Sequence, residues 1–79
     1  MTIIDVRTPG EFMGGHVAGS LNIPLQEIQN RKDEIMALAQ PIVLCCASGM
    51  RSGQATAYLK SLGLDCENGG SWLDVNGDY

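Results

Sequence analysis

The segment from Pro41 to Gly63 constrains the fold of this 79-residue chain most, because it joins an apolar strand directly to an amphipathic helix. Pro41 to Cys45 is apolar on both faces, which is typical of a strand at the centre of a parallel sheet. The helical pattern that follows places four apolar residues on one face, Ala55, Tyr58, Leu59 and Leu62. A strand that feeds a helix in this way predicts an α/β sheet.

Shorter patterns of the same two kinds fill the rest of the chain. We expect three further short strands, over Thr2–Val6, Leu21–Pro24 and Leu64–Asn68, and a turn at Gly69-Gly70 after the last of them. Helical spacing covers Leu25–Ala39, where a polar stretch splits it in two, and a last helical turn covers Ser71–Val75. Residues 1–79 are therefore expected to form a single domain with four to five short strands flanked by helices.

The composition and the first apolar stretch argue against nucleic acid and membranes as partners. Nine acidic against five basic residues give a net charge of −4, which argues against nucleic-acid binding. The first apolar stretch is interrupted by Asp5, so neither a signal peptide nor a membrane span is expected. Nothing in the chain demands more than a monomer.

The cysteines point to reduced thiols. There are three, two of them adjacent, which does not make a disulfide framework. His16 is the only histidine and no Cys-x-x-Cys pair is present, so no metal site is expected. Reduced thiols suit the cytoplasm, or the periplasm if a signal peptide has been removed.

The chemistry is expected in the cysteine loop, Cys46 to Ser52, where the strand ends and the helix begins. Backbone N–H groups of such a turn point inward, and the helix N-terminus adds partial positive charge. Arg51 adds a full charge, Gly49 permits the positive φ that the turn needs, and Ser52 can cap the helix. These are the conditions that lower the pKa of a thiol and hold an anion beside its sulfur.

Two registers of this loop are open. Counted from Cys45, Arg51 completes the Cys-x5-Arg spacing of a phosphatase or arsenate reductase loop. Such loops usually place glycine third after the cysteine, and Gly49 holds that position only when the count begins at Cys46. The glycine therefore favours Cys46 as nucleophile and places Cys45 on the opposite, core-facing side of the strand.

From Cys46, the pattern Cys-x-x-Gly-x-Arg resembles the active-site loop of the rhodanese (sulfurtransferase) family. Other segments agree in order: Asp5-Val6-Arg7 with the turn Pro9–Phe12, then Gly15–Pro24, and finally Asn68-Gly69-Gly70. The helix that begins Arg51-Ser52-Gly53 is most similar to small single-domain members of the phage-shock type. The family usually has a strand and a helix before the Asp-x-Arg strand, so the resemblance implies a minimal or N-terminally trimmed rhodanese-like fold.

The resemblance implies an enzyme, a thiosulfate sulfurtransferase without metal or organic cofactor. Cys46 would take a sulfane sulfur from thiosulfate or a persulfide donor and pass it to cyanide or a thiol acceptor. The loop residues that would cradle this persulfide are Ala47, Ser48, Gly49, Met50, Arg51 and Ser52. Arg51 is the only cation among them, so the donor is expected to be a less charged persulfide. An alternative is a sulfur carrier or interaction module that serves a protein acceptor with little small-molecule turnover.

Structural roles are expected for the other notable residues. Asp5 and Arg7, at the end of a strand, support the site as an ion pair or loop brace. His16 is interpreted as a structural hydrogen-bonding residue, and Trp72 as a packing residue. The remaining predictions are that Cys45, Cys66 and Met36 lie in the core and that Met50 is exposed at the rim of the loop.

Overall fold

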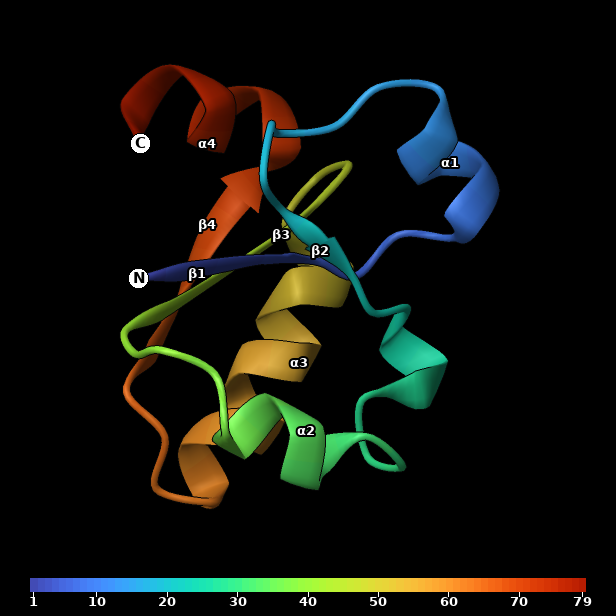
Figure 1. Cartoon of the computed structure of the whole chain (residues 1–79). Coiled ribbons are helices and arrows are strands. Elements are labelled where there is room, and N and C mark those ends of the chain that lie inside the picture. Colours follow the sequence, from blue (N-terminus) through green and yellow to red (C-terminus); the bar gives the residue numbers. More distant parts are fainter.

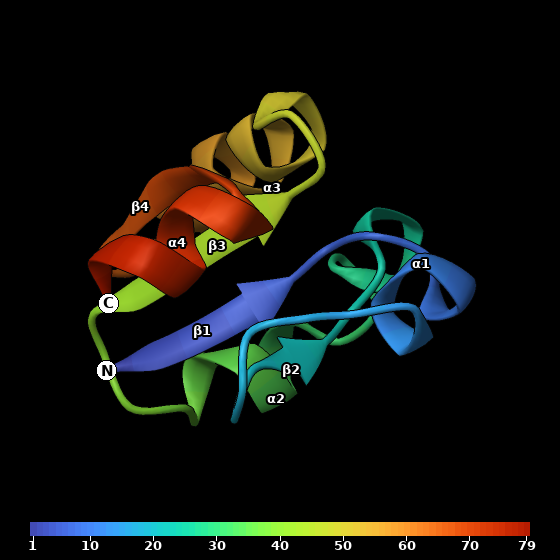
Figure 2. The ribbon, with the colours of Figure 1, turned by 90° about the horizontal axis from the view of Figure 1, so that it is seen from above.

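The computed structural model describes residues 1–79 and contains one parallel four-stranded sheet. The strands lie in the order β2-β1-β3-β4 and are Thr2–Asp5 (β1), Leu21–Asn22 (β2), Ile42–Cys46 (β3) and Cys66–Ser71 (β4). Figure 2 shows this order, with the arrowheads of β1, β2 and β3 on one side. The predicted α/β class and the central position of the Pro41–Cys45 strand are confirmed.

Short helices connect the strands. They are Pro9–Met13 (α1), the 3-10 turn Leu25–Glu27 (η1), Lys32–Met36 (α2), Met50–Ser61 (α3) and Trp72–Asp78 (α4). Thr8 caps α1 through a capping box in which Thr8 and Glu11 bond each other's backbone N–H. The expected break in the helical stretch after Leu25 is confirmed by the separate η1 and α2.

Hydrophobic side chains pack on both faces of the sheet, because successive residues of a strand point to opposite sides. The larger cluster joins Ile4, Ile42 and Leu44 to Leu59 of α3 and Ile35 of α2. The smaller cluster has four buried members, Val17, Val43, Cys45 and Val75. In Figure 1, α2 and α3 accordingly lie on one side of the sheet and α4 on the other.

The predicted bounds of the last strand are wrong. β4 runs through Gly69 and Gly70, where a turn was expected, and its register against β3 shifts between Leu44 and Cys45. A Cβ at Gly69 would lie 2.5 Å from a methyl of Val75 and 2.9 Å from one of Val43. Glycine therefore lets α4 pack closely onto the sheet, while the shift keeps the strand paired.

One core prediction is also wrong. Met36 is 46% exposed at the end of α2, whereas its neighbour Ile35 is fully buried. A helix of five residues presents only one narrow stripe to the sheet, and Ile35 occupies it. The expected burial of Cys45 and Cys66 and the expected exposure of Met50 are confirmed.

Candidate functional site

The cysteine loop connects β3 to α3 beyond the carboxyl end of the sheet (Figure 2). Gly49 stands at the N-cap of α3 with φ +96°, a conformation that favours glycine. A Cβ on Gly49 would also approach the Cα of Gly70 to 3.2 Å. Gly49 therefore supports both the tight turn and the close contact with β4.

The Cys46 thiol lies inside this turn. Its sulfur accepts a hydrogen bond from the Gly49 N–H at 2.9 Å and lies 3.4 Å from the Ser52 hydroxyl oxygen. Burial of the thiol favours its neutral form. The hydroxyl of Ser52 and the N–H groups of Ser52, Gly49 and Ser48 outweigh that effect and lower the pKa of Cys46 to about 7. A substantial fraction of Cys46 is therefore thiolate at neutral pH.

Cys45 has the opposite environment. It lies in the cluster with Val43 and Val75, on the α4 side of the sheet. Burial, aided by the nearby charge of Asp5, raises the pKa of Cys45 to about 12. This thiol stays protonated and faces away from the loop, which excludes it as the nucleophile of a Cys-x5-Arg phosphatase or arsenate reductase.

Ser52 does not cap α3 as the sequence suggested, because Gly49 takes that position and the helix begins at Met50. The buried Ser52 hydroxyl instead lies between the Cys46 sulfur and the amide oxygen of Asn68, 2.7 Å away. A hydroxyl has one proton, so it can donate to only one of these two acceptors at a time.

Asn68 is the residue that sequence reasoning missed as part of the site. Its amide NH2 donates to the carbonyl of Gly49 at 3.0 Å, and its amide oxygen also accepts from the Gly70 N–H. It thus fixes both the turn and the serine that faces the thiol. One signal could have identified it: a polar residue near the carboxyl end of the strand that neighbours the cysteine strand.

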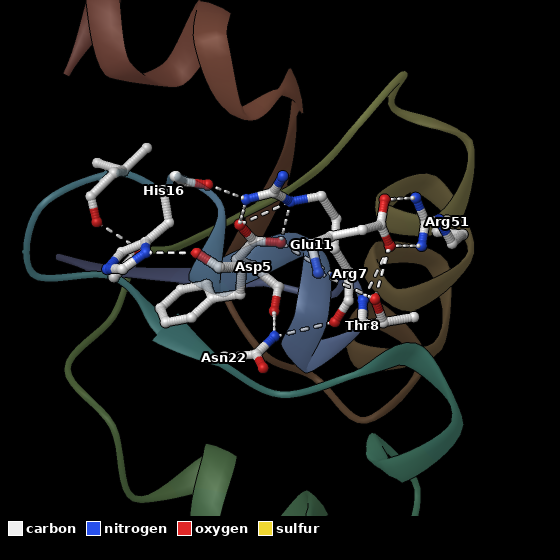
Figure 3. A network of polar contacts seen from close by, with 11 residues as sticks. Asp5, Arg7, Thr8, Glu11, His16, Asn22 and Arg51 are labelled. Carbon is white, nitrogen blue, oxygen red and sulfur yellow. Dashed lines mark hydrogen bonds and ion pairs between the residues drawn. The ribbon is translucent and has the colours of Figure 1, made fainter.

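Arg51 does not point into the cysteine loop in this structure. Its guanidinium makes two hydrogen bonds to the carboxylate of Glu11 in α1, at 2.8 and 3.0 Å (Figure 3). Arg51, with help from Thr8, lowers the pKa of Glu11 to about 2, so this carboxylate is ionised at neutral pH. A direct role of Arg51 in binding a substrate remains a prediction.

Asp5 and Arg7 form a buried ion pair at the end of β1, with 2.7 Å between an Arg7 nitrogen and an Asp5 oxygen. Arg7 also donates to the carbonyl of Gly15 and lies 4.9 Å from the ring centre of Trp72. The side chain of Asn22 bonds the carbonyls of both partners (Figure 3). The expected ion pair is present, and these bonds tie the end of β1 to the loop at Gly15 and to β2. Support of the reactive loop by this pair remains a prediction.

Comparison with known proteins identifies the family of this chain. Residues 1–74 match the sequence profile of the family described as "Rhodanese-like domain". The chain belongs to the rhodanese-like family. It is 37% identical over 78 residues to the thiosulfate sulfurtransferase PspE of Escherichia coli, covering 91% of this chain and 71% of that protein.

Two further relatives define what this similarity covers. The uncharacterised protein YqhL of Bacillus subtilis is 46% identical over 61 residues, which are 77% of this chain and 48% of YqhL. The rhodanese-like chain therefore spans only about half of that relative. A solved structure described as "rhodanese with anions from E. coli" superposes with a TM-score of 0.83 at 35% identity, over 92% of this chain and 88% of that one. The rhodanese fold expected from the motifs is confirmed.

His16 and Trp72 have structural contacts in this rhodanese-like chain. A ring nitrogen of His16 lies 2.7 Å from the carbonyl of Phe12, and the two rings stack 3.6 Å apart. Trp72 covers Arg7 and packs against Gly15. These contacts agree with the structural interpretation of both residues.

Two surface grooves, each of about 370 Å³, lie away from Cys46. One runs between η1 and α3 and is lined by Gln26, Gln29, Gln54 and Tyr58 among others. Neither groove is lined by Cys46 or by another residue of the cysteine loop. No three His, Cys, Asp or Glu side chains lie close enough together to hold a metal ion, and no helix is long and apolar enough to cross a membrane.

Proposed function

We propose that this rhodanese-like chain is a sulfurtransferase in which Cys46 carries the transferred sulfur as a persulfide. The observation that supports this most is a thiol with a pKa of about 7 surrounded by N–H and O–H donors of its own loop. The thiolate is the form that attacks sulfur. The same donors can stabilise the negative charge on the outer sulfur of a persulfide.

The reaction balances in two half-reactions. The Cys46 thiolate attacks the outer sulfur of the donor and forms a new S–S bond. The old bond to that sulfur breaks, and the leaving group, sulfite in the case of thiosulfate, departs with the electron pair. An acceptor such as cyanide then attacks the outer sulfur and leaves as thiocyanate, and the electron pair returns to Cys46. No net oxidation of the protein occurs, and the chemistry requires no cofactor.

The charge of the cysteine loop favours a persulfide donor of low charge over thiosulfate. Ala47, Ser48 and Met50 are neutral, and the only cation, Arg51, is already paired with Glu11. A donor with two negative charges thus finds backbone N–H groups but no free cation in the loop. A small persulfide needs less compensation of charge and can use the same N–H groups.

Intact mass spectrometry tests the proposal. After incubation with a small alkyl persulfide or with thiosulfate, we expect the wild-type chain to gain the mass of one sulfur atom, which cyanide removes. Cys45→Ser is the matched control and should gain the same sulfur, whereas Cys46→Ser should not. A cyanide-removable sulfur on Cys46→Ser would overturn the assignment.

A sulfur carrier is the second candidate, because the rim of the cysteine loop is open to a protein partner. Ala47 and Ser48 are exposed, and Met50 is 75% exposed beside the buried Cys46. An exposed apolar residue next to a reactive thiol suits contact with an acceptor protein. Steady-state turnover of persulfide and cyanide discriminates the two: an enzyme makes thiocyanate for many cycles, while a carrier loads once and turns over slowly.

A further inference from the structure

The electrostatics of the loop rim depend on a residue outside the cysteine loop. Glu11 comes from α1, 40 positions before Arg51 in the chain, yet its two carboxylate oxygens bond the two terminal nitrogens of that arginine. Arg51 lies in the first turn of α3, two residues after Gly49, whose N–H bonds the Cys46 sulfur, and its positive charge acts on that thiol. The negative charge of Glu11 therefore offsets the positive charge of Arg51, the only cation in the cysteine loop.

Glu11 is held in place independently of Arg51. Its carboxylate accepts the backbone N–H of Thr8 at 3.0 Å and lies 3.2 Å from the Thr8 hydroxyl, as part of the capping box of α1. The carboxylate thus stays at the rim even when Arg51 moves. Both partners of the ion pair are about one-third exposed, with side-chain exposures of 36% for Glu11 and 35% for Arg51, so an incoming donor meets both.

We propose that Glu11 is a specificity-determining residue that disfavours donors with two negative charges. It does so by cancelling the charge of Arg51 at the rim of the cysteine loop. This inference rests on the proposed function, because it concerns which donor loads Cys46. A dianion such as thiosulfate is repelled by the fixed carboxylate of Glu11 and gains little attraction from the neutralised Arg51. A persulfide with at most one negative charge is repelled less.

The test is the rate at which each donor loads sulfur onto Cys46, measured by intact mass at low salt. Glu11→Gln removes the charge but keeps the capping box, since glutamine fills that position as well as glutamate. We expect loading by thiosulfate to rise about two- to fivefold, the range typical of an exposed charge pair. The rate of loading by a small alkyl persulfide should rise by less than about half as much as the rate of loading by thiosulfate.

Glu34→Gln is the matched control. Glu34 pairs with Arg31 on α2, so its replacement changes the net charge equally without touching the cysteine loop. It should leave the ratio of the two loading rates at the wild-type value. High salt should reduce the gain of Glu11→Gln, because exposed charges are screened.

The outcomes separate this inference from the proposed function. If Cys46 loads in every variant but Glu11→Gln leaves the ratio of the two rates unchanged, or raises it as much as Glu34→Gln does, Glu11 does not set donor preference. A gain that persists undiminished at high salt would also overturn the electrostatic basis. Failure of the wild-type chain to load either donor at Cys46 would instead reject the proposed function itself.

Discussion

Cys45 and Cys46 are adjacent in the chain, yet they belong to two different regions of the molecule. Cys46 faces the cysteine loop and α3, where N–H and O–H donors lower the pKa of its thiol to about 7. Cys45 faces α4 among apolar side chains, where burial raises its pKa to about 12. The comparison teaches that burial alone does not make a thiol inert, because both side chains are fully buried. The donors around the sulfur decide its ionisation.

The largest expected difference between the two cysteines is in alkylation. At pH 7.5, a small alkylating reagent should modify Cys46 at least about 100-fold faster than Cys45, because only the thiolate reacts. Peptide mapping by mass spectrometry after short exposures measures both rates in one sample. Comparable rates in the folded protein would show that the two environments do not differ as described.

The two thiols should also affect stability in opposite pH ranges. The folded pKa of Cys46 is depressed below the unfolded value, so its contribution is complete above about pH 9 and is lost as pH falls through about 7. This contribution amounts to about 3 kcal/mol. The folded pKa of Cys45 is raised instead, so its contribution holds below about pH 9 and declines as pH rises toward 12.

Urea denaturation at several pH values measures these contributions. Relative to wild type, Cys46→Ser should lack the rise in the free energy of unfolding between about pH 7 and pH 9. Cys45→Ser should retain that rise, which makes it the control. An identical pH dependence for wild type and Cys46→Ser would contradict the lowered pKa.

Removal of the Ser52 hydroxyl tests the side-chain part of the cradle around Cys46. Ser52→Ala should raise the pKa of Cys46 by up to about one unit, because one of several donors to the thiolate is lost. Ser48→Ala is the control, since Ser48 acts through its backbone N–H, which the variant keeps. The pH dependence of the alkylation rate measures both. Equal shifts in the two variants would deny the Ser52 hydroxyl a specific role.

Local sequence patterns predicted the different placement of Cys45 and Cys46, because this placement depends on residues that are neighbours in the chain. The apolar Pro41–Cys45 run, the period of two along it and the position of Gly49 were sufficient to place Cys46 in the loop and Cys45 in the core. The capping box of α1 is local as well, since Thr8 and Glu11 are only three residues apart.

Long-range packing decided what these patterns could not predict. Asn68 reaches Ser52 across 16 positions and Glu11 reaches Arg51 across 40, and neither pair leaves a periodic signal. The two glycines of β4 indicated a turn, yet close contact of Gly69 with Val75 and Val43 keeps them in the strand. Tertiary contacts of this kind override local preference.

The smallest expected effect on sulfur loading comes from replacing Cys45, the core-facing cysteine. Cys45→Ala removes a buried sulfur beside Val43 and Val75 and should cost about 1–2 kcal/mol of stability through the cavity it leaves. Because the side chain points away from the cysteine loop, sulfur loading of Cys46 and its pKa of about 7 should stay near wild type. Thermal denaturation and persulfide loading measured on the same sample separate the two effects. A loss of loading in a folded Cys45→Ala variant would mean that the α4 face of the sheet also positions the reactive thiol.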